Sequence, residues 1–256
     1  MNQGMRFFHL ILYTPQIQHE QEMKLLLQHY LQQLRFSPFC FYCFNPDQEE
    51  ELVYNRDSHI LSFRGTENYQ YGILDKTIRA LKWVLEISHV NFQYIIRSNI
   101  STFVNLPMVA GILAHLPYRV DYTGLFWNTG AGVDDEAGFT EEKYLKYGSI
   151  SFASGIAIIL SVRAAQWIVY HKREVLVEEI GVVDDLALGV LFAKDEETLG
   201  QRFRCGPIHR NGNFWVSVND ETVDRKYCTA YRNKRENRED DVKAIFNLIK
   251  KFNYGK

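Results

Sequence analysis

Short apolar runs alternate with amphipathic segments along the first part of the chain. Four apolar runs predict buried strands, at residues 6–13, 37–44, 59–64 and 92–96. Between them, apolar residues at helical spacing predict helices over 18–34 and 74–87. Strands that alternate with helices in this way are typical of a mostly parallel sheet covered on both faces. We therefore predict an α/β protein.

The pattern changes after residue 117. Further strands are expected at 118–127 and 150–160, with a glycine- and aspartate-rich loop at 128–138 between them. Short strands joined by a hairpin turn at Asn211-Gly212 are expected within 202–218. Three more helices are predicted, at 162–170, 184–192 and 240–252. No repeat or linker marks a boundary, so we predict one domain over residues 1–256.

The composition limits the possible partners. Of 256 residues, 46% are hydrophobic, which is enough for a sizeable core. The 29 basic and 31 acidic residues leave a formal charge of -2, so no overall field attracts nucleic acid or anionic lipid. No stretch approaches about eighteen continuous apolar residues, and we expect no membrane insertion.

The N-terminus and the cysteines favour a soluble protein of the cytoplasm. Pro15 closely follows the first apolar run, and no small-residue cleavage site accompanies it. Cys40 and Cys43 form a Cys-x-x-Cys sequence inside a predicted strand, which places them on opposite faces and favours two core cysteines. The absence of an obvious disulfide framework fits a reducing compartment.

One stretch, YIIRSNISTFVN at residues 94–105, begins as a buried strand and then turns polar. The strand ends in Arg97, Asn99, Ser101 and Thr102, with no carboxylate among them. Ligands of α/β proteins usually lie at the carboxyl ends of strands. We therefore expect this polar end to line a binding site.

Four segments, taken in order, carry a family resemblance. They are Lys76-Thr77 in a predicted helix, the stretch 94–105, the segment 147–161 with Ser154-Gly155, and Val183-Asp184-Asp185 before a helix. In this order they resemble the GT-A glycosyltransferases of the β-1,3-galactosyltransferase-like family, glycosyltransferase family 31, and the related enzymes of large DNA viruses. The likeness runs from about residue 60 to 192.

The resemblance implies a GT-A fold, a Rossmann-like mixed sheet flanked by helices. It implies a nucleotide-sugar-binding half at 1–105 and a half at 106–256 that binds the acceptor and supplies the base. The activity implied is inverting transfer of a sugar from a nucleotide diphosphate, expected to be a UDP-sugar, to a hydroxyl of a carbohydrate acceptor. Without an anchor, such transfer is expected in the cytoplasm, the host cytoplasm if the protein is viral.

The metal site of the family is altered in this chain. Matching Phe103-Val104-Asn105 to the family places Asn99, Ile100 and Ser101 where three aspartates normally stand. The outer carboxylates of that triplet hold Mn²⁺, which bridges the donor phosphates. An amide and a hydroxyl are poor replacements, so dependence on Mn²⁺ or Mg²⁺ is an open question.

Basic residues are the alternative means of neutralising the leaving diphosphate. We hypothesise that Arg97, Arg232 and Lys234 do part of the work of a metal. The resemblance adds Lys76, which matches the family lysine, and Thr14, which stands where the nucleotide base docks. Two other interpretations stay open: Arg97 pairs with a nearby carboxylate, and residues 232–238 form a solvated face.

The acidic pair Asp184-Asp185 is the candidate catalytic group. The resemblance places Asp185 as the base that deprotonates the acceptor hydroxyl and Asp184 as its acidic neighbour. Either residue could instead cap the following helix. For the acceptor we expect Gly155, which permits close approach of a sugar, and Trp127, which offers an aromatic face. Ordinary strand packing and core burial explain these two residues equally well.

Two further interpretations compete with metal-free transfer. The carboxylates of Asp134-Asp135-Glu136 could bind a cation in place of the missing triplet, although such a cluster is more often a solvated loop. His209 could supply a late metal ligand, although a lone histidine is usually structural. A protein of another class, a catalytically silent binder of glycans or nucleotides, would keep the fold without needing the aspartate base.

Overall fold

The structure is a computed structural model. It describes residues 6–33, 37–87, 92–116, 119–129, 134–207, 214–216, 230–232 and 238–252.

A seven-stranded mixed sheet forms the centre of the molecule, with strand order β3-β4-β2-β1-β5-β10-β7. Its parallel part consists of β1 (Phe7–Leu12), β2 (Phe39–Asn45), β4 (Ile60–Arg64) and β5 (Tyr94–Asn99). Antiparallel neighbours flank this part, namely β3 (Leu52–Asn55) beside β4, and β10 (Ile158–Ser161), which lies between β5 and β7 (Tyr122–Thr123). The expected α/β class with a mixed sheet is therefore confirmed.

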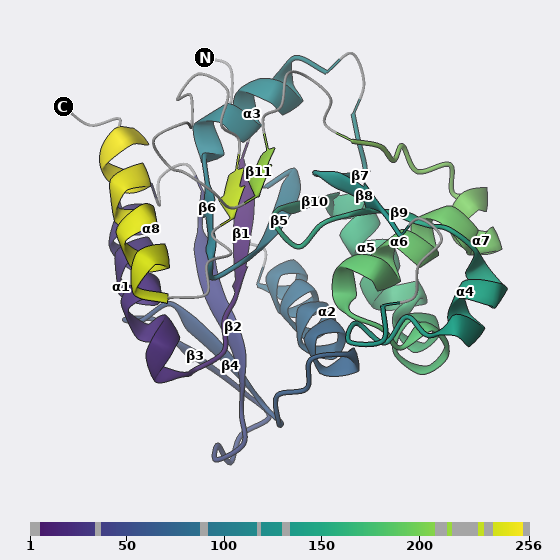
Figure 1. Cartoon of the computed structure of the whole chain (residues 1–256), viewed down its shortest axis with the longest axis horizontal. Helices are drawn as coiled ribbons and strands as arrows, with labels where there is room; N and C mark the ends of the chain where they lie inside the picture. The colour runs from purple at the N-terminus through teal and green to yellow at the C-terminus, as the bar shows by residue number, and fades with distance from the viewer. Residues whose placement is uncertain are drawn as a thin grey trace.

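Helices cover both faces of this sheet (Figure 1). One face packs against α2 (Tyr71–Glu86), α5 (Val162–His171) and α6 (Asp184–Lys194). The other face packs against α1 (Ile17–Leu31), α3 (Leu106–Ala114) and α8 (Arg238–Phe252). Alternate residues of each central strand enter the two cores, and so Cys40 belongs to the first and Cys43 to the second. The cysteines lie on opposite faces, as the sequence predicted.

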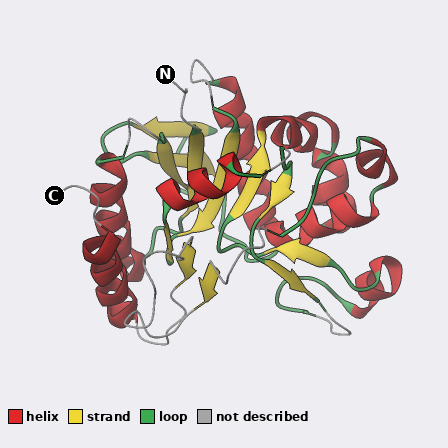
Figure 2. Ribbon diagram, turned by 90° about the horizontal axis from the view of Figure 1, so that it is seen from above, coloured by secondary structure: helices red, strands yellow, loops and turns green. Residues whose placement is uncertain are grey.

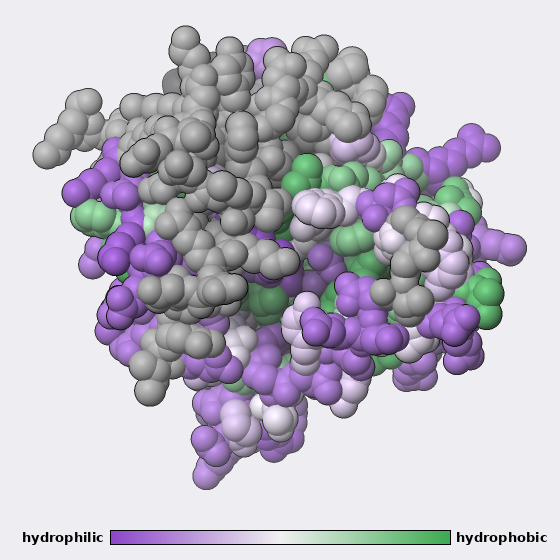
Figure 3. Space-filling view, viewed as in Figure 1, coloured by the Kyte–Doolittle hydropathy of each residue, from purple (hydrophilic) through white to green (hydrophobic). Residues whose placement is uncertain are grey.

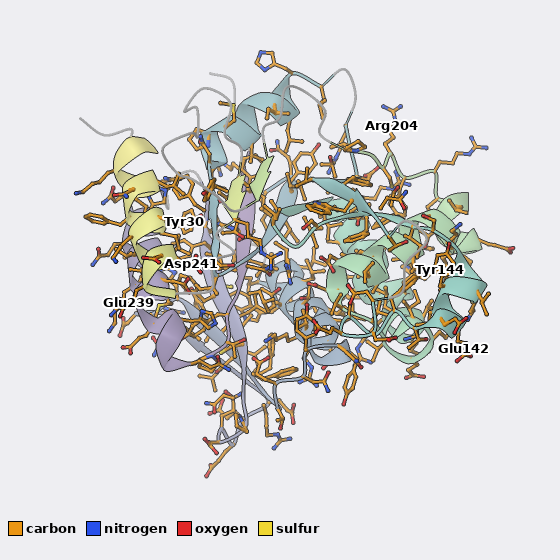
Figure 4. The ribbon with its side chains drawn as sticks, viewed as in Figure 1. Tyr30, Glu142, Tyr144, Arg204, Glu239 and Asp241 are labelled. Carbon is orange, nitrogen blue, oxygen red and sulfur yellow. The ribbon has the colours of Figure 1, made fainter. Side chains whose placement is uncertain are left out.

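A smaller three-stranded sheet adjoins α1 and α8. It has the order β11-β12-β6 and consists of β11 (Phe214–Val216), β12 (Ala230–Arg232) and β6 (Thr102–Val104). Tyr30 of α1 is fully buried, and its hydroxyl accepts a hydrogen bond from the backbone N–H of Val104 in β6. Figure 4 shows Tyr30 and Asp241 on the two neighbouring helices. Because β6 directly follows β5, this sheet brings β12 close to the end of β5.

Two of the expected strands are each divided between separate sheets. The region 118–127 contains β7 and then β8 (Phe126–Asn128), and the region 150–160 contains β9 (Ser151–Ala153) and then β10. Within the described part of the chain, β8 and β9 form a separate two-stranded sheet (Figure 2). Both breaks occur at glycines: Gly124 has φ 157°, and a Cβ there would lie 2.4 Å from the carbonyl oxygen of Ala157. Gly155 lies between β9 and β10, two residues after the end of β9.

The sequence analysis did not predict several of the helices and strands. These are the exposed edge strand β3, β6, β12, α3, α4 (Glu141–Tyr147), the π-helix η1 (Val175–Ile180) and α7 (Glu196–Gly200). The expected hairpin at Asn211-Gly212 lies outside the described residues. In the view of Figure 3 the described surface is mostly hydrophilic. None of the helices in the described ranges is long and apolar enough to cross a membrane.

Candidate active site

A cavity of about 200 Å³ lies at the carboxyl ends of β1 and β5. These strands are neighbours, but β1 continues into α1 on one face of the sheet, whereas β5 is reached from α2 on the other face. This reversal is the switch point at which open α/β sheets bind ligands. The lining residues are Leu12, Thr14, His19, Tyr69, Ile73, Arg97, Asn99, Ile100, Ser101, Gly155, Val183, Asp184, Asp185 and Arg232.

The guanidinium of Arg97 is the best-anchored group of the cavity. Its Nε and Nη2 lie 2.7 and 2.9 Å from the two carboxylate oxygens of Asp184. Its Nη1 donates to Asn99 Oδ1 at 2.7 Å and to the carbonyl oxygen of Gly155 at 3.0 Å. Burial is the largest single effect and lowers the pKa of Arg97, but Asp184, Tyr42 and Asp185 together outweigh it, and the pKa is raised. The structure therefore shows the carboxylate pairing that the sequence left open.

Asp184 is held by α2 as well as by Arg97. Thr77 Oγ1 donates to Asp184 Oδ2 at 2.8 Å, and the hydroxyl of Tyr42 is 2.9 Å from the same Thr77 oxygen. The Tyr42 hydroxyl also interacts with the guanidinium of Arg97. Only 2% of Asp184 is exposed. A polar network thus runs from β2 through α2 and α6 to β5, and it fixes the orientation of the first turn of α6.

Asp185 lies at the next position and is only partly buried. Its Oδ2 accepts the backbone N–H of Gly155 at 3.0 Å, and its Oδ1 accepts that of Leu186 at 2.9 Å. Burial, followed by the charge of Asp184, raises the pKa of Asp185, although Arg97 and the two N–H groups act in the opposite direction. A carboxylate that is accessible, fixed in position and made more basic is suited to accept a proton.

The structure gives a packing reason for a glycine at position 155. A Cβ at this position would lie 2.6 Å from Arg97 Nη1, 3.4 Å from Asn99 Nδ2 and 3.5 Å from Asp185 Oδ2. The missing side chain therefore lets three polar groups converge on one backbone unit, whose carbonyl oxygen and N–H contact Arg97 and Asp185 respectively.

The expected donor residues are only partly assembled around the cavity. Thr14, Arg97, Asn99, Ser101 and Arg232 line it, whereas Lys234 and His209 lie outside the described residues. Lys76 is not among the lining residues. Its fully buried Nζ lies 2.6 and 2.5 Å from the two carboxylate oxygens of Glu67, and burial lowers the pKa of Lys76 despite this partner.

The expected acceptor residues are separated. Gly155 lines the cavity, whereas Trp127 lies on β8 opposite Phe152 and does not line it. Trp127 is 49% exposed, which excludes complete core burial.

Sequence reasoning missed two polar residues of the cavity. His19 lies in the first turn of α1, and its Nδ1 is 2.7 Å from Oε2 of buried Glu22. The detectable signal was this histidine and glutamate at helical i,i+3 spacing just after a strand. Tyr69 precedes α2 and is 63% exposed. It lines the same cavity as Asp185.

The described residues of the cavity do not fit a divalent metal ion. Asn99, Ile100 and Ser101 offer no carboxylate, and both oxygens of Asp184 and of Asp185 already accept protein donors. Asp134 Oδ1 accepts the N–H of Ala137 at 3.0 Å within its own turn. Across the described ranges, no three His, Cys, Asp or Glu side chains are grouped to hold a metal.

Comparisons with known proteins give structural likeness at low identity. No family model matches the chain, and no curated protein matches it in sequence. A glycosyltransferase involved in glycosylation of the major capsid of PBCV-1 is 7% identical, with a TM-score of 0.49 over 94% of this chain and 99% of its own. The galactosyltransferase LgtC, solved with donor and acceptor sugar analogues, is 9% identical, with a TM-score of 0.49 over 94% and 95%.

A 4-diphosphocytidyl-2C-methyl-D-erythritol synthase from Anaerococcus prevotii is also similar, at 13% identity and a TM-score of 0.46 over 96% of each chain. These scores and identities are low. The function proposed below therefore depends on the residues of the site.

Proposed function

We propose that this protein is a GT-A glycosyltransferase that moves a sugar from a nucleotide diphosphate to a hydroxyl group of a carbohydrate acceptor. One observation carries the proposal: Asp185, a partly exposed carboxylate with a raised pKa, lies in a cavity at the switch point of the sheet. A protein that only binds its ligand has no need of a basic carboxylate at this point.

Asp185 has the role of the general base. Its two oxygens are held by backbone N–H groups, so that the carboxylate can take the proton of an acceptor hydroxyl while that oxygen attacks the anomeric carbon. The bond from the anomeric carbon to the phosphate oxygen breaks, and its electron pair remains on the nucleoside diphosphate. Inversion at the anomeric carbon and a UDP-sugar donor are the finer parts of the proposal, and they come from the family resemblance.

Both halves of the chain contribute to the proposed site. Thr14, Asn99 and Ser101 come from residues 1–105, and Asp185 and Arg232 come from residues 106–256. We assign the former group to the nucleotide sugar and Asp185 to the acceptor. Trp127, exposed on β8, is proposed to contact the acceptor glycan outside the cavity.

Arg97 has a different proposed role from the one expected from sequence. Its N–H groups point to Asp184, Asn99, Gly155 and Tyr42, so it has little capacity left for a phosphate. We assign it to the positioning of Asp185 through Gly155. Arg232 is then the cavity arginine proposed to meet the diphosphate, and Lys76 supports α2 through Glu67. Because the donor set does not fit a metal, the proposed transfer is metal-independent.

A silent binder of nucleotides or glycans is the second candidate. The observation in its favour is that both oxygens of Asp185 already accept backbone N–H groups, an arrangement that also stabilises the start of a helix. Such a protein would bind the same ligands but would not release nucleotide.

A panel of nucleotide sugars distinguishes these candidates. Nucleotide release and thermal shift are measured together, each with EDTA and with Mn²⁺. The proposal predicts release with at least one donor that persists in EDTA. Release only with Mn²⁺ contradicts metal-independent transfer, and a thermal shift without release, in the presence of an acceptor panel, supports the silent binder.

A further inference from the structure

A histidine that lines the cavity is paired with a buried glutamate behind it, and neither the sequence nor the comparisons assign this pair a function. His19 belongs to the first turn of α1 and lines the same cavity as Asp185. Its Nδ1 is 2.7 Å from Glu22 Oε2. Only 8% of His19 and none of Glu22 is exposed. The His19–Glu22 pair is therefore buried, unlike the exposed Lys24–Glu20 pair on the same helix.

Glu22 fixes how the imidazole can act. Its carboxylate accepts from Nδ1, so the ring is held with Nε2 as the nitrogen available for another contact. Among the described residues Nε2 has no hydrogen-bond partner, and Glu22 Oε1 is buried without one. A buried carboxylate in this state favours a cationic neighbour, and an anion bound at Nε2 would complete the pair.

The neighbouring residues are suited to an anion. Thr14 lies in the loop that leads from β1 into α1, and Ser101 follows the end of β5. Arg232 is paired in register with Thr102, the residue next to Ser101. Besides the carboxylates of Asp184 and Asp185, the cavity is lined by the imidazole of His19, the guanidinium groups of Arg97 and Arg232, and the hydroxyls of Thr14, Tyr69 and Ser101. The imidazole, guanidinium and hydroxyl groups can donate hydrogen bonds to phosphate oxygens.

We propose that the His19–Glu22 pair binds the diphosphate of the donor and stabilises it as the leaving group. This inference rests on the proposed function and adds a residue that touches the substrate. In the bound state, imidazolium Nδ1–H donates to Glu22 and Nε2–H donates to a phosphate oxygen. When the glycosidic phosphate bond breaks, the electron pair moves to that phosphate group, and the hydrogen bond from Nε2 offsets the developing charge. The acceptor proton goes to Asp185.

The test compares binding of UDP, uridine and inorganic pyrophosphate by calorimetry in EDTA. The variant H19N keeps an amide donor near Glu22 and removes the group at Nε2. It is expected to weaken UDP and pyrophosphate binding by about tenfold or more, as for loss of a charge-assisted hydrogen bond, with uridine binding unchanged. E22Q is expected to give a smaller loss of the same kind. E20Q, in the exposed pair of the same helix, is the matched control and should bind like wild type.

The outcomes separate the two proposals. If wild type binds UDP and H19N binds it equally well, the role of His19 is wrong and the proposed function stands. If H19N weakens uridine as much as UDP, its effect is structural and the inference also fails. If wild type binds none of UDP, uridine, other nucleoside diphosphates and pyrophosphate, the proposed function itself fails, and the inference with it. Thermal melting of each variant confirms that it is folded.

Discussion

Arg97 and Asp184 form a buried two-point ion pair, with Nε and Nη2 of the guanidinium at 2.7 and 2.9 Å from the two carboxylate oxygens. Both residues are 2% exposed. The pair joins the end of β5 to the start of α6. It holds in place the backbone of Gly155, which in turn donates to Asp185. The pair thus places a buried cation at the carboxyl end of β5, inside the cavity.

Breaking this pair should be costly. In R97M the carboxylate of Asp184 remains buried but loses its main partner. In D184N the guanidinium of Arg97 remains buried but loses its charged partner. Each single variant is expected to lose about 3–5 kcal/mol of unfolding free energy. The double variant R97M/D184N should lose less than the sum of the two. Urea unfolding of the four proteins measures this coupling, and simple additivity would contradict a direct energetic link.

Gly155 should tolerate no side chain. In G155A the new Cβ would lie 2.6 Å from Arg97 Nη1, so the guanidinium must move and weaken its contacts. We expect a loss of about 1–3 kcal/mol in stability together with a large loss of activity. The matched control is G111A in α3, where nothing lies within 4 Å of the added Cβ. Helix propensity predicts that this control is neutral or slightly more stable. Equal melting temperatures of G155A and G111A would contradict the packing argument.

Removal of the proposed base should separate catalysis from binding. D185N is expected to reduce transfer about 10²–10⁴-fold while the nucleotide still binds. The pH profile of the wild type follows from the same residue. Because the pKa of Asp185 is raised, transfer should fall as pH decreases through this raised pKa, when the carboxylate becomes protonated. Rate measurements across pH check this, and an unchanged acid limb in residual D185N activity would argue against the assignment.

Two buried histidines should make the fold sensitive to acid. His9 in β1 and His29 in α1 have pKa values lowered by burial to about 3 and about 4, from an ordinary value of 6.5. Between these values and 6.5 the unfolded chain binds protons that the folded chain does not. Stability is therefore full above about pH 6.5 and decreases as pH falls, by up to about 1.4 kcal/mol per pH unit for each histidine.

Urea unfolding across this pH range measures the effect. The variant H9Q/H29Q should show a flatter pH dependence whatever its absolute stability. A slope equal to that of the wild type would show that other groups cause the acid sensitivity.

The sequence predicted the local elements better than their assembly. Apolar runs located β1, β2 and β5, because these strands are buried on both faces. They also located β4, in which Leu61 and Phe63 are buried and alternate with less buried residues. The edge strand β3 was missed because its apolar run, Leu52-Val53-Tyr54, is only three residues long and lies between polar segments. The regions 118–127 and 150–160 each appeared to be one strand, since hydrophobicity does not reveal that a glycine redirects the chain into a different sheet.

The same limit applied to the site. Polar residues at the end of β5 and the pair Asp184-Asp185 could be recognised because they interrupt apolar patterns. Their pairing could not, because Arg97 and Asp184 are far apart in sequence and only the fold brings them together. His19 was missed for a related reason: the first turn of a helix is a common place for polar residues, and its role depends on the cavity beside it.

The most direct test of the proposed function measures nucleotide release from a panel of nucleotide sugars, with acceptor present and EDTA added, for wild type and D185N side by side. The proposal predicts that wild type releases nucleotide from at least one donor, and that D185N binds that donor but releases nucleotide at least about 100-fold more slowly. Equal rates for the two proteins, or no release by wild type from any donor, would contradict it.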